Sequence, residues 1–422
     1  MPVVLGIIFL DILGLGILIP VLPQLMYEIF LPAGHSMAGA LILLGWLTAI
    51  YPLFQFLSTP VLGQLSDRYG RRPVLIISLA GTALGYLITV AGILMHNIPL
   101  MFAGRALDGI TGGNISVARA VVADVTPPRH RARNFGLMGA MFGVGFILGP
   151  VVGARLASPN SEIFGLFTTP QWFGSATPFW FAAAVSLLTV ILVATCLPET
   201  HANIDRTIRL AWTRSLEHIR LAATRPGLRV VFGAEFLFWG GFTFFMTFFQ
   251  ILLIEKLGFA TRNVGDFFGY IGICVALSQA LLVPLAVKYF KIHDILRISL
   301  LASGAALLLT LWPSDTIQLL LIAPVVAVFI GLTMAAAPAL VSLSASQRDQ
   351  GEVLGVEASV QALAQAIPAI ISGYVATVGV NAPVLWGGSA MLVGGLLFLG
   401  FYHVPKTVRR KEELHEMPAP KL

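Results

Sequence analysis

Long apolar runs, each broken only by a short polar turn, most constrain how this chain of 422 residues can fold. The runs at 37–62 and 73–95, for example, are separated only by the segment Gly63–Arg72. A run of about 20 apolar residues is long enough to cross a bilayer as an α-helix. The mean hydropathy of +0.87 and the charged fraction of 11% also lie outside the range of soluble domains. An integral membrane protein is therefore expected.

The fold class predicted by this pattern is all-α, with about twelve transmembrane helices. The runs are continuous, whereas the strands of a membrane β-barrel would show short alternating segments. The expected spans are 3–28, 37–63, 73–95, 99–124, 133–156, 178–197, 229–254, 264–288, 293–312, 316–343, 353–378 and 382–404.

A polar stretch midway along the chain divides these spans into two sets of six. The expected domains are a six-helix bundle at 1–198, a cytoplasmic linker with an amphipathic segment at 199–228, a second six-helix bundle at 229–404 and a cytoplasmic tail at 405–422. Gly136 and Pro150 of the fifth span recur as Gly355 and Pro368 in the eleventh, about half the chain later. Two similar halves with a site between them are a common transporter architecture.

The distribution of basic residues predicts which face of the membrane each loop occupies. Most of the 26 lysines and arginines fall in loops on the face that carries Gly63–Arg72, three arginines lie inside spans, and only Lys256 and Arg262 fall in loops on the opposite face. Cytoplasmic loops are enriched in Lys and Arg, so both termini are expected in the cytoplasm. The net charge of +6 is therefore interpreted as a topology signal, and no nucleic-acid partner is expected.

Sites for metals, cofactors or covalent chemistry are not evident in the sequence. Cys196 and Cys274 lie in separate apolar runs, and the histidines are scattered. No metal, no cofactor and no enzymatic activity are expected.

Three motifs lie in the second, fourth and fifth spans or at their ends. The turn Gly63–Arg72 resembles the G-x-L-x-D-R-x-G-R-[RK] signature of the major facilitator superfamily. The segment Leu100–Gly112 resembles the arginine motif of the fourth helix, and Gly145–Gly153 resembles the fifth-helix motif of the antiporter branches. The resemblance implies a twelve-helix transporter in the cell (inner) membrane that works by alternating access.

Further segments are most similar to the tetracycline-efflux group within that superfamily. They are Asp11–Pro23, Arg131–Gly136 and Leu197–Thr200. Exporters of that group carry an acid in the third span, where this chain has Gly85, and another in the ninth span, which is apolar here at 298–311. These departures argue against tetracycline as the substrate.

A conformational latch is predicted at the basic turn. It would include Gly63, Asp67, Arg68, Gly70, Arg71, Arg72 and Asp124. Asp67 would dock on the positive N-terminus of the eleventh helix near Gly351, and Arg71 would pair with Asp124. The alternative is that the arginines only enforce topology.

Charged residues inside the spans are candidates for proton coupling, because burying them is costly. They are Asp11, Arg105, Asp108, Arg119 and Glu235. Similar depth in the membrane predicts an Asp11–Arg119 pair. Arg105 and Asp108 are i,i+3 neighbours on one helix face, either as a proton carrier or as a static ion pair.

A second acid on the other half of the chain, Glu357, is expected to complement the N-terminus of the eleventh helix. The fifth-span glycines and proline, Gly145, Gly149, Pro150 and Gly153, are expected to allow close packing and a bend.

Polar and aromatic side chains within the spans are candidates for a substrate pocket. They are Gln24, Gln55, Asn114, Phe238, Phe242, Phe245, Gln250 and Gln361. Interhelical hydrogen bonding and ordinary packing are the alternative roles.

The predicted function is proton-coupled efflux, by antiport, of a small lipophilic or drug-like molecule. The alternative is proton-coupled import or facilitated uptake of a nutrient, metabolite or siderophore. The expected partners are the substrate, protons and the lipid bilayer, and the chain is expected to act as a monomer.

Overall fold

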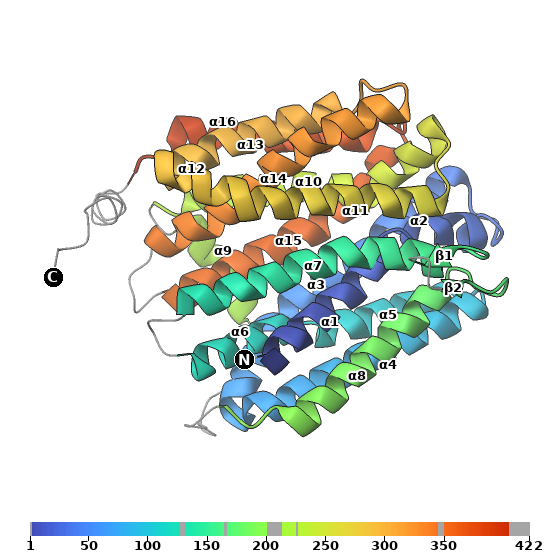
Figure 1. Ribbon diagram of the computed structural model, residues 1–422, viewed down its shortest axis with the longest axis horizontal. Helices are drawn as coiled ribbons and strands as arrows, with labels where there is room; N and C mark the ends of the chain where they lie inside the picture. Colours follow the sequence, from blue (N-terminus) through green and yellow to red (C-terminus); the bar gives the residue numbers. More distant parts are fainter. Residues whose placement is uncertain are drawn as a thin grey trace.

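The computed structural model describes residues 2–126, 131–163, 167–200, 213–224, 227–344 and 350–404. Within the helices, a few further side chains, Asp11 among them, also lie outside the described part. The chain forms a bundle of long helices that run roughly side by side (Figure 1). We call the end that carries Gly63–Arg72 the basic end and the opposite one the far end.

The first half of the described chain contains the helices α1 (Pro2–Leu18), α2 (Leu22–Leu25), η1 (Met26–Phe30), α3 (Met37–Tyr69), α4 (Arg71–Leu94), α5 (Ile98–Thr111), α6 (Asn114–Val125), α7 (Arg131–Leu156) and α8 (Thr177–Cys196). A short antiparallel ladder at the far end pairs β1 (Glu162–Ile163) with β2 (Phe167–Thr168), with Glu162 opposite Thr168. This ladder was not expected from the sequence, and it connects α7 to α8.

The second half contains α9 (Arg214–Thr224), α10 (Arg229–Leu257), α11 (Thr261–Leu277), η3 (Ser278–Leu282), α12 (Val283–Tyr289), α13 (Ile292–Leu309), α14 (Thr316–Ser344), α15 (Gln350–Ala376) and α16 (Ala382–Phe401). The η elements are π-helical turns. η1 continues α2 at the end of the first predicted span, and η3 joins α11 and α12 into the eighth.

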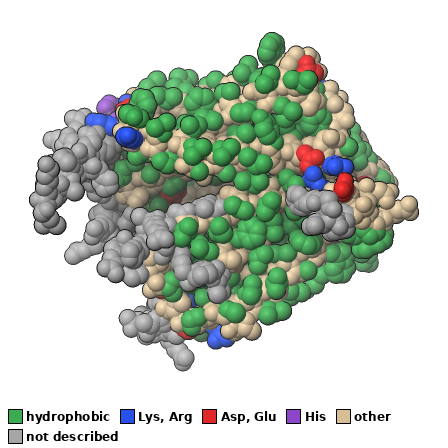
Figure 2. Space-filling view, in the orientation of Figure 1, with side chains coloured by type: hydrophobic (Ala, Val, Ile, Leu, Met, Phe, Trp, Pro, Cys, Tyr) green, Lys and Arg blue, Asp and Glu red, His purple; other side chains and the backbone are tan. Residues whose placement is uncertain are grey.

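Ten helices of the described chain are long and apolar enough to cross a membrane. The other two predicted spans are the fifth and the fourth. The fifth is α7, and the fourth is divided into α5 and α6 at Gly112 and Gly113. Hydrophobic side chains cover much of the outer surface, as shown by the face in Figure 2. Exposed Ile77, Leu281 and Trp386 illustrate this. Such a surface suits a lipid environment, so the predicted all-α membrane fold is confirmed.

The two halves contact each other closely at the far end. A Cβ added to Gly45 of α3 would lie 2.7 Å from the carbonyl oxygen of Ala369 in α15. A Cβ added to Gly265 of α11 would lie 2.7 Å from the carbonyl oxygen of Pro150 in α7. Small residues therefore bring these helices together where larger ones would separate them. Toward the basic end, the surface is hollowed between the halves (Figure 2).

The helix α9 lies at the basic end and packs on α15, α10 and α3, so it contacts both halves. Its His218 is buried, and one ring nitrogen lies 3.0 Å from the Ser359 hydroxyl of α15. Ile219 and Leu221 pack on the core of the second half. The amphipathic segment predicted in the linker thus includes a helix, while its residues 201–212 lie outside the described part.

Candidate functional site

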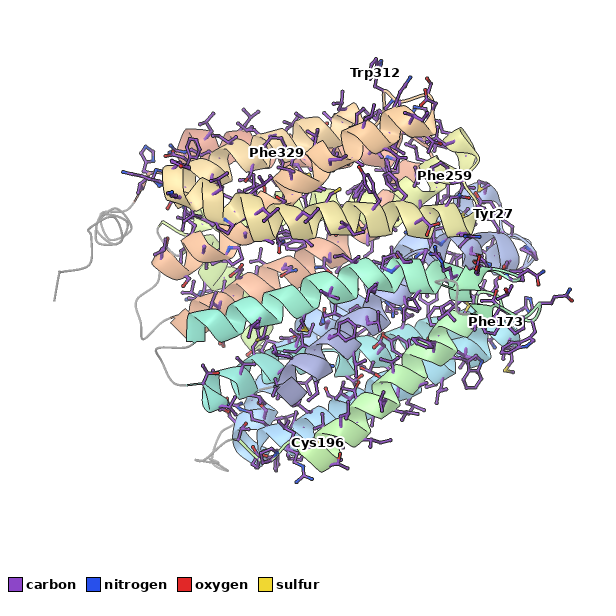
Figure 3. All side chains as sticks on the ribbon, in the orientation of Figure 1. Tyr27, Phe173, Cys196, Phe259, Trp312 and Phe329 are labelled. Carbon is purple, nitrogen blue, oxygen red and sulfur yellow. The ribbon has the colours of Figure 1, made fainter. Side chains whose placement is uncertain are left out.

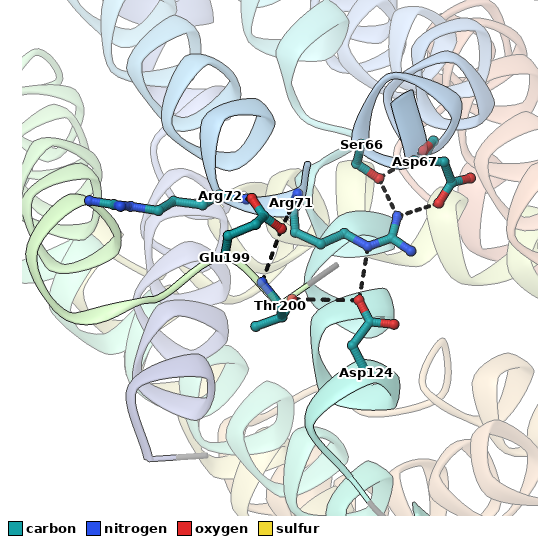
Figure 4. A network of polar contacts seen from close by, with 8 residues as sticks. Ser66, Asp67, Arg71, Arg72, Asp124, Glu199 and Thr200 are labelled. Atoms are coloured by element: carbon teal, nitrogen blue, oxygen red, sulfur yellow. Dashed lines mark hydrogen bonds and ion pairs between the residues drawn. The ribbon is translucent and has the colours of Figure 1, made fainter. Parts of the chain in front are cut away.

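The basic turn is organised around the side chain of Arg71 (Figure 4). Its Nε donates to Asp124 Oδ2 at 3.1 Å, and its Nη1 donates to Asp67 Oδ1 at 2.5 Å and to Ser66 Oγ at 2.6 Å. The Arg71 side chain is only 9% exposed. The predicted contact between Arg71 and Asp124 is therefore present, and it joins α3, α4 and α6 within the first half.

Glu199, just beyond α8, caps the N-terminus of α4. Its two carboxylate oxygens accept hydrogen bonds from the backbone N–H groups of Arg71 at 2.9 Å and Arg72 at 3.1 Å. A carboxylate at this position satisfies two unpaired donors and complements the helix dipole. Gly70 makes the arrangement possible, because its φ is +102° and a Cβ would overlap the Glu199 carboxylate.

Sequence reasoning missed this role of Glu199, although the acid belongs to the Leu197–Thr200 segment that carries part of the family resemblance. Thr200 Oγ1 also lies 3.5 Å from Asp124 Oδ2. Arg72 reaches back along α8, where its Nη2 donates to the carbonyl oxygen of Ala194. Arg68 lies over the ring of Tyr69, with its guanidinium carbon 5.2 Å from the ring centroid.

The predicted contact of Asp67 with the eleventh helix cannot be followed to its partner. The helix α15 starts at Gln350, but the side chains of its first residues, near Gly351, lie outside the described part. Asp67 is 43% exposed and makes an ion pair with Arg71. A Cβ added to Gly63, one helical turn earlier, would meet no atom within 4 Å. The latch role of this turn stays a prediction.

In the fourth span, Arg105 and Asp108 form a buried ion pair. The distance between Arg105 Nη1 and Asp108 Oδ2 is 2.7 Å, and their side chains are 7% and 1% exposed. The guanidinium of Arg105 lies 4.8 Å from the centroid of the Tyr51 ring in α3. Gly85 of α4 packs directly on this pair, since an added Cβ would lie 3.0 Å from the Cβ of Asp108.

Directly after this ion pair, the break between α5 and α6 exposes backbone carbonyls that side chains of neighbouring helices satisfy. Gln55 Nε2 donates to the Gly112 oxygen at 2.8 Å and to the Tyr51 hydroxyl at 3.1 Å. Ser58 Oγ donates to the Gly109 oxygen at 3.1 Å, and Ser78 Oγ donates to the Thr111 oxygen at 2.5 Å. Non-helical backbone inside a membrane is stable only when it is satisfied in this way.

A second set of charged residues lies between the two halves, nearer the basic end. Arg119 of α6 interacts electrostatically with Glu357 of α15, and Glu357 interacts with Glu235 of α10. The Arg119 side chain is exposed although it lies more than one turn inside α6. We call these three residues the central cluster.

Glu235 is the most deeply buried member of the central cluster, at 3% exposure. Neither of its carboxylate oxygens has a hydrogen-bond partner among the described residues. A buried carboxylate without donors is costly while it is ionised. The cluster therefore holds two carboxylates and one guanidinium, and one carboxylate has no cation of its own.

The central cluster bears on two predictions about individual residues. Glu357 lies two turns into α15 and faces the other half, so it does not cap the N-terminus of that helix. Arg119 has an acidic partner in Glu357. The predicted Asp11–Arg119 pair is untested, because the side chain of Asp11 lies outside the described part.

The residues predicted to form a substrate pocket are dispersed in this conformation. Phe238 and Phe245 are 1% and 0% exposed in the core of the second half, and Phe242, at 9%, packs beside them. Gln361 is partly buried and lies one turn along α15 from Glu357, on the same helix face.

The other polar candidates are mostly engaged in contacts between or within helices. Gln24 donates to Glu28 at 2.6 Å near the far end, and Gln250 donates to the Met246 oxygen of its own helix at 2.9 Å. Asn114 is buried in the first turn of α6.

The antiporter-type segment of α7 packs on α1, as its small residues predicted. A Cβ added to Gly149 would lie 2.6 Å from the Cα of Gly16, and one added to Gly145 would lie 3.0 Å from Ile12 Cγ2. Gly153 is closer still, because an added Cβ would overlap the carbonyl oxygen of Ile17. Pro150 lies inside this helix.

The far end is held closed by polar contacts that join the two halves. Arg155 of α7 forms an ion pair with Asp266 of α11, with an Nη1–Oδ1 distance of 2.6 Å. The Tyr27 hydroxyl donates to Glu255 Oε1 at 3.4 Å, and Trp46 Nε1 lies 3.4 Å from the Tyr374 hydroxyl.

Sequence reasoning did not identify the far-end contacts. The available signals were an arginine inside the fifth span, Arg155, and an acid near the start of the eighth, Asp266. Tyr27 is labelled at the far end in Figure 3, and Cys196 lies at the opposite end of the molecule. Both cysteines are free, and among the described residues no three His, Cys, Asp or Glu side chains could hold a metal ion.

The family model described as Major Facilitator Superfamily matches residues 4–294 and also residues 231–421. The class C tetracycline resistance protein of Escherichia coli is 30% identical over 410 residues, which cover 94% of each chain. The class G protein of Vibrio anguillarum is 31% identical over 403 residues, again 94% of each chain. Quinolone resistance protein NorA of Staphylococcus aureus (strain COL) is 26% identical over 396 residues, or 93% of this chain and 94% of NorA.

Solved structures show the same fold. The human organic anion transporter MFSD10 (TETRAN) superposes with a TM-score of 0.71 at 22% identity, covering 94% of this chain and 98% of that chain. The inward open conformation of the xylose transporter XylE from E. coli gives a TM-score of 0.72 at 17% identity, covering 97% and 98%.

Proposed function

Because this chain belongs to the major facilitator superfamily, we propose that it exports a small lipophilic, drug-like molecule in exchange for protons by alternating access. The chain is a multi-pass membrane transporter, and several of its relatives are named for resistance to tetracycline, to quinolones or to multiple drugs. Gly85 and the apolar ninth span argue against tetracycline itself as the substrate of this chain.

The observation that carries the proposal is the central cluster. Its charges belong to both halves: Arg119 to the first, and Glu235 and Glu357 to the second. When the halves close at the basic end, water leaves the space between them, and every uncompensated charge there becomes more costly. Closure therefore requires that the surplus carboxylate be neutralised.

Exchange results if a proton and the substrate compete to neutralise the surplus carboxylate. A proton can bind Glu235 directly. A substrate that brings a cationic or hydrogen-bond-donating group can compensate the same carboxylate instead. In each half-cycle the transporter then carries either the proton or the substrate, which is antiport. Gln361, one turn from Glu357, is the residue we expect to contact the substrate.

Other charged residues have supporting roles in this proposal. Asp11 and the Arg105–Asp108 pair remain candidates for carrying the proton further along the first half. The basic turn, with Asp67, Arg71 and Asp124, is the proposed latch of the basic end. The basic end faces the cytoplasm in this proposal, so the contacts at the far end hold the outer side closed.

An importer of a nutrient, metabolite or siderophore is the alternative function. It would use the same fold and the same cluster, but substrate and proton would move in the same direction. The direction of coupling therefore separates the two functions, whereas the position of the charged residues does not.

The test is transport by purified protein in proteoliposomes with an imposed pH gradient, using a panel of lipophilic drugs, metabolites and siderophores. We expect accumulation of a lipophilic compound on the acidic side. In Glu235→Gln and Glu357→Gln, gradient-driven accumulation should be lost while substrate-for-substrate counterflow continues. Glu28→Gln, an exposed acid at the far end, is the matched control.

Two results would overturn the proposal. Accumulation on the alkaline side would establish import. Full proton-driven transport by both cluster variants would remove the central cluster from coupling and return that role to Asp11 or Asp108.

A further inference from the structure

We propose that a pocket at the far end, separate from the central cluster, binds a lipophilic monovalent cation and thereby holds the two halves closed at this end. The pocket has a volume of about 320 Å³. Its walls include Met37, Leu41, Phe248, Ile251, Glu255 and Pro383. A pocket of this size suits a small drug-like molecule.

The chemistry of the walls specifies the class of ligand. Apart from Glu255, the wall residues are apolar or uncharged, so an organic ion with a large apolar surface fits better than a metal ion or a sugar. Met37 is exposed, and its flexible thioether can adapt to ligands of different shape.

Glu255 supplies the charge selectivity. Its carboxylate is exposed and accepts one long hydrogen bond, 3.4 Å, from the Tyr27 hydroxyl. Among the described residues no Lys, Arg or His lies within ion-pairing distance of it. The neighbouring Lys256 is engaged elsewhere, since its Nζ donates to the carbonyl oxygen of Leu311 at 2.7 Å. A bound organic cation would supply the missing partner.

The pocket belongs to one conformation of the transporter. Met37 and Leu41 lie on α3 of the first half, whereas Phe248, Ile251 and Glu255 lie on α10 of the second half. Opening of the far end would separate these walls and remove the pocket. A ligand that binds only one of two conformations shifts the population toward it, so the bound cation is an inhibitor that acts from the far side.

This site is distinct from the proposed substrate site. The central cluster lies near the basic end of α6, α10 and α15, whereas Glu255 lies at the opposite end of α10, twenty residues from Glu235 and roughly 30 Å away at 1.5 Å per residue. Inhibition should therefore be non-competitive with substrate. The inference needs a transporter with two conformations, but it does not depend on the proton as the coupling ion.

The experiment measures binding of radiolabelled tetraphenylphosphonium to the purified full-length protein in nanodiscs. Glu255→Gln should weaken binding by roughly three- to tenfold, the effect of losing one partly solvated ion pair. Ala38→Trp, which fills the pocket from an exposed position on α3, should abolish binding. Glu28→Gln, an acid at the same end that does not line the pocket, should bind as the unmodified protein does.

Two further variants test whether the probe binds this pocket or the central cluster. The part of tetraphenylphosphonium binding that Ala38→Trp removes should persist in Glu235→Gln. Asp266→Asn, which removes a far-end contact without touching the pocket, should weaken the affinity by favouring the open far end. The inference is overturned if Glu255→Gln binds normally, or if Glu235→Gln abolishes binding, which would assign the probe to the central site. Because binding is measured without transport, failure here would not bear on the proposed export function.

Discussion

Removal of the ion pair between Arg155 and Asp266 should open the far end of the transporter. The pair joins α7 of the first half to α11 of the second, at an Nη1–Oδ1 distance of 2.6 Å. Beside it the two helices are in close contact at Gly265. Separation of the halves at this end requires that this ion pair break, so it stabilises the closed conformation relative to the open one.

The exposure of the two side chains determines how much free energy the ion pair is expected to contribute to the closed conformation. Arg155 is 12% exposed and Asp266 is 43% exposed. Fully exposed pairs contribute up to about 1 kcal/mol, and breaking a fully buried pair costs about 3–5 kcal/mol. A half-shielded pair should contribute about 1–2 kcal/mol, which changes the ratio of open to closed molecules by a factor of roughly 5 to 30.

Chemical labelling can measure this change. In a background of Cys196→Ser and Cys274→Ala, a single cysteine replaces Ile251 of α10, a larger residue that is buried and packs on the core of the first half. A membrane-impermeant maleimide should react with it only while the far end is open. Asp266→Asn and Arg155→Gln should each raise the labelling rate by the factor given above. A cysteine in place of exposed Gln171 measures the reactivity of the maleimide itself, independent of opening at the far end.

Two controls make the interpretation specific. Arg262, one turn from Asp266, lies 4.0 Å from its carboxylate and is half exposed, so Arg262→Gln should have little effect. The reversed pair, Arg155→Asp with Asp266→Arg, should restore slow labelling. Unchanged labelling in both single variants would refute the reasoning, because the pair would then contribute equally to the open and closed conformations.

Three further predictions concern the first half of the chain. Glu199→Ala should lower stability by about 1–2 kcal/mol through loss of the α4 cap, seen as a lower thermal unfolding midpoint in detergent, whereas exposed Glu162→Ala should not. Gly149→Ala should destabilise by about 1–3 kcal/mol in the same assay by forcing α1 and α7 apart, whereas Gly143→Ala, where a Cβ meets nothing within 4 Å, should be neutral. Asp67→Asn should slow substrate exchange in proteoliposomes and leave equilibrium substrate binding intact; weaker binding with normal exchange would place Asp67 in the binding site.

The helical membrane fold and several local contacts could be predicted from the sequence because they depend on residues close together in the chain. The length of each apolar run determines a span. Arg105 and Asp108 are three residues apart on one helix, so their ion pair follows from helix geometry. The contact between Arg71 and Asp124 follows from their placement at the basic ends of helices that are near neighbours in the chain.

Contacts between the halves could not be predicted in the same way. In a soluble helix, the apolar stripe identifies the face that packs against the protein. In a membrane helix, the lipid-facing and protein-facing sides are both apolar, so periodicity does not reveal which side meets which helix. For this reason Glu357 was expected to cap its own helix, although in the structure it interacts with Arg119 of the other half.

The sequence by itself therefore determined that this chain is a bundle of membrane helices, and its basic turn identified the family. The tertiary structure decided which charged residues face each other. Arg119 and Glu357 are more than two hundred residues apart, and Arg155 and Asp266 are more than one hundred apart. Which of these charges come near each other depends on the rotation and relative depth of helices from different halves, and these are set by small residues such as Gly45 and Gly265 at the interface.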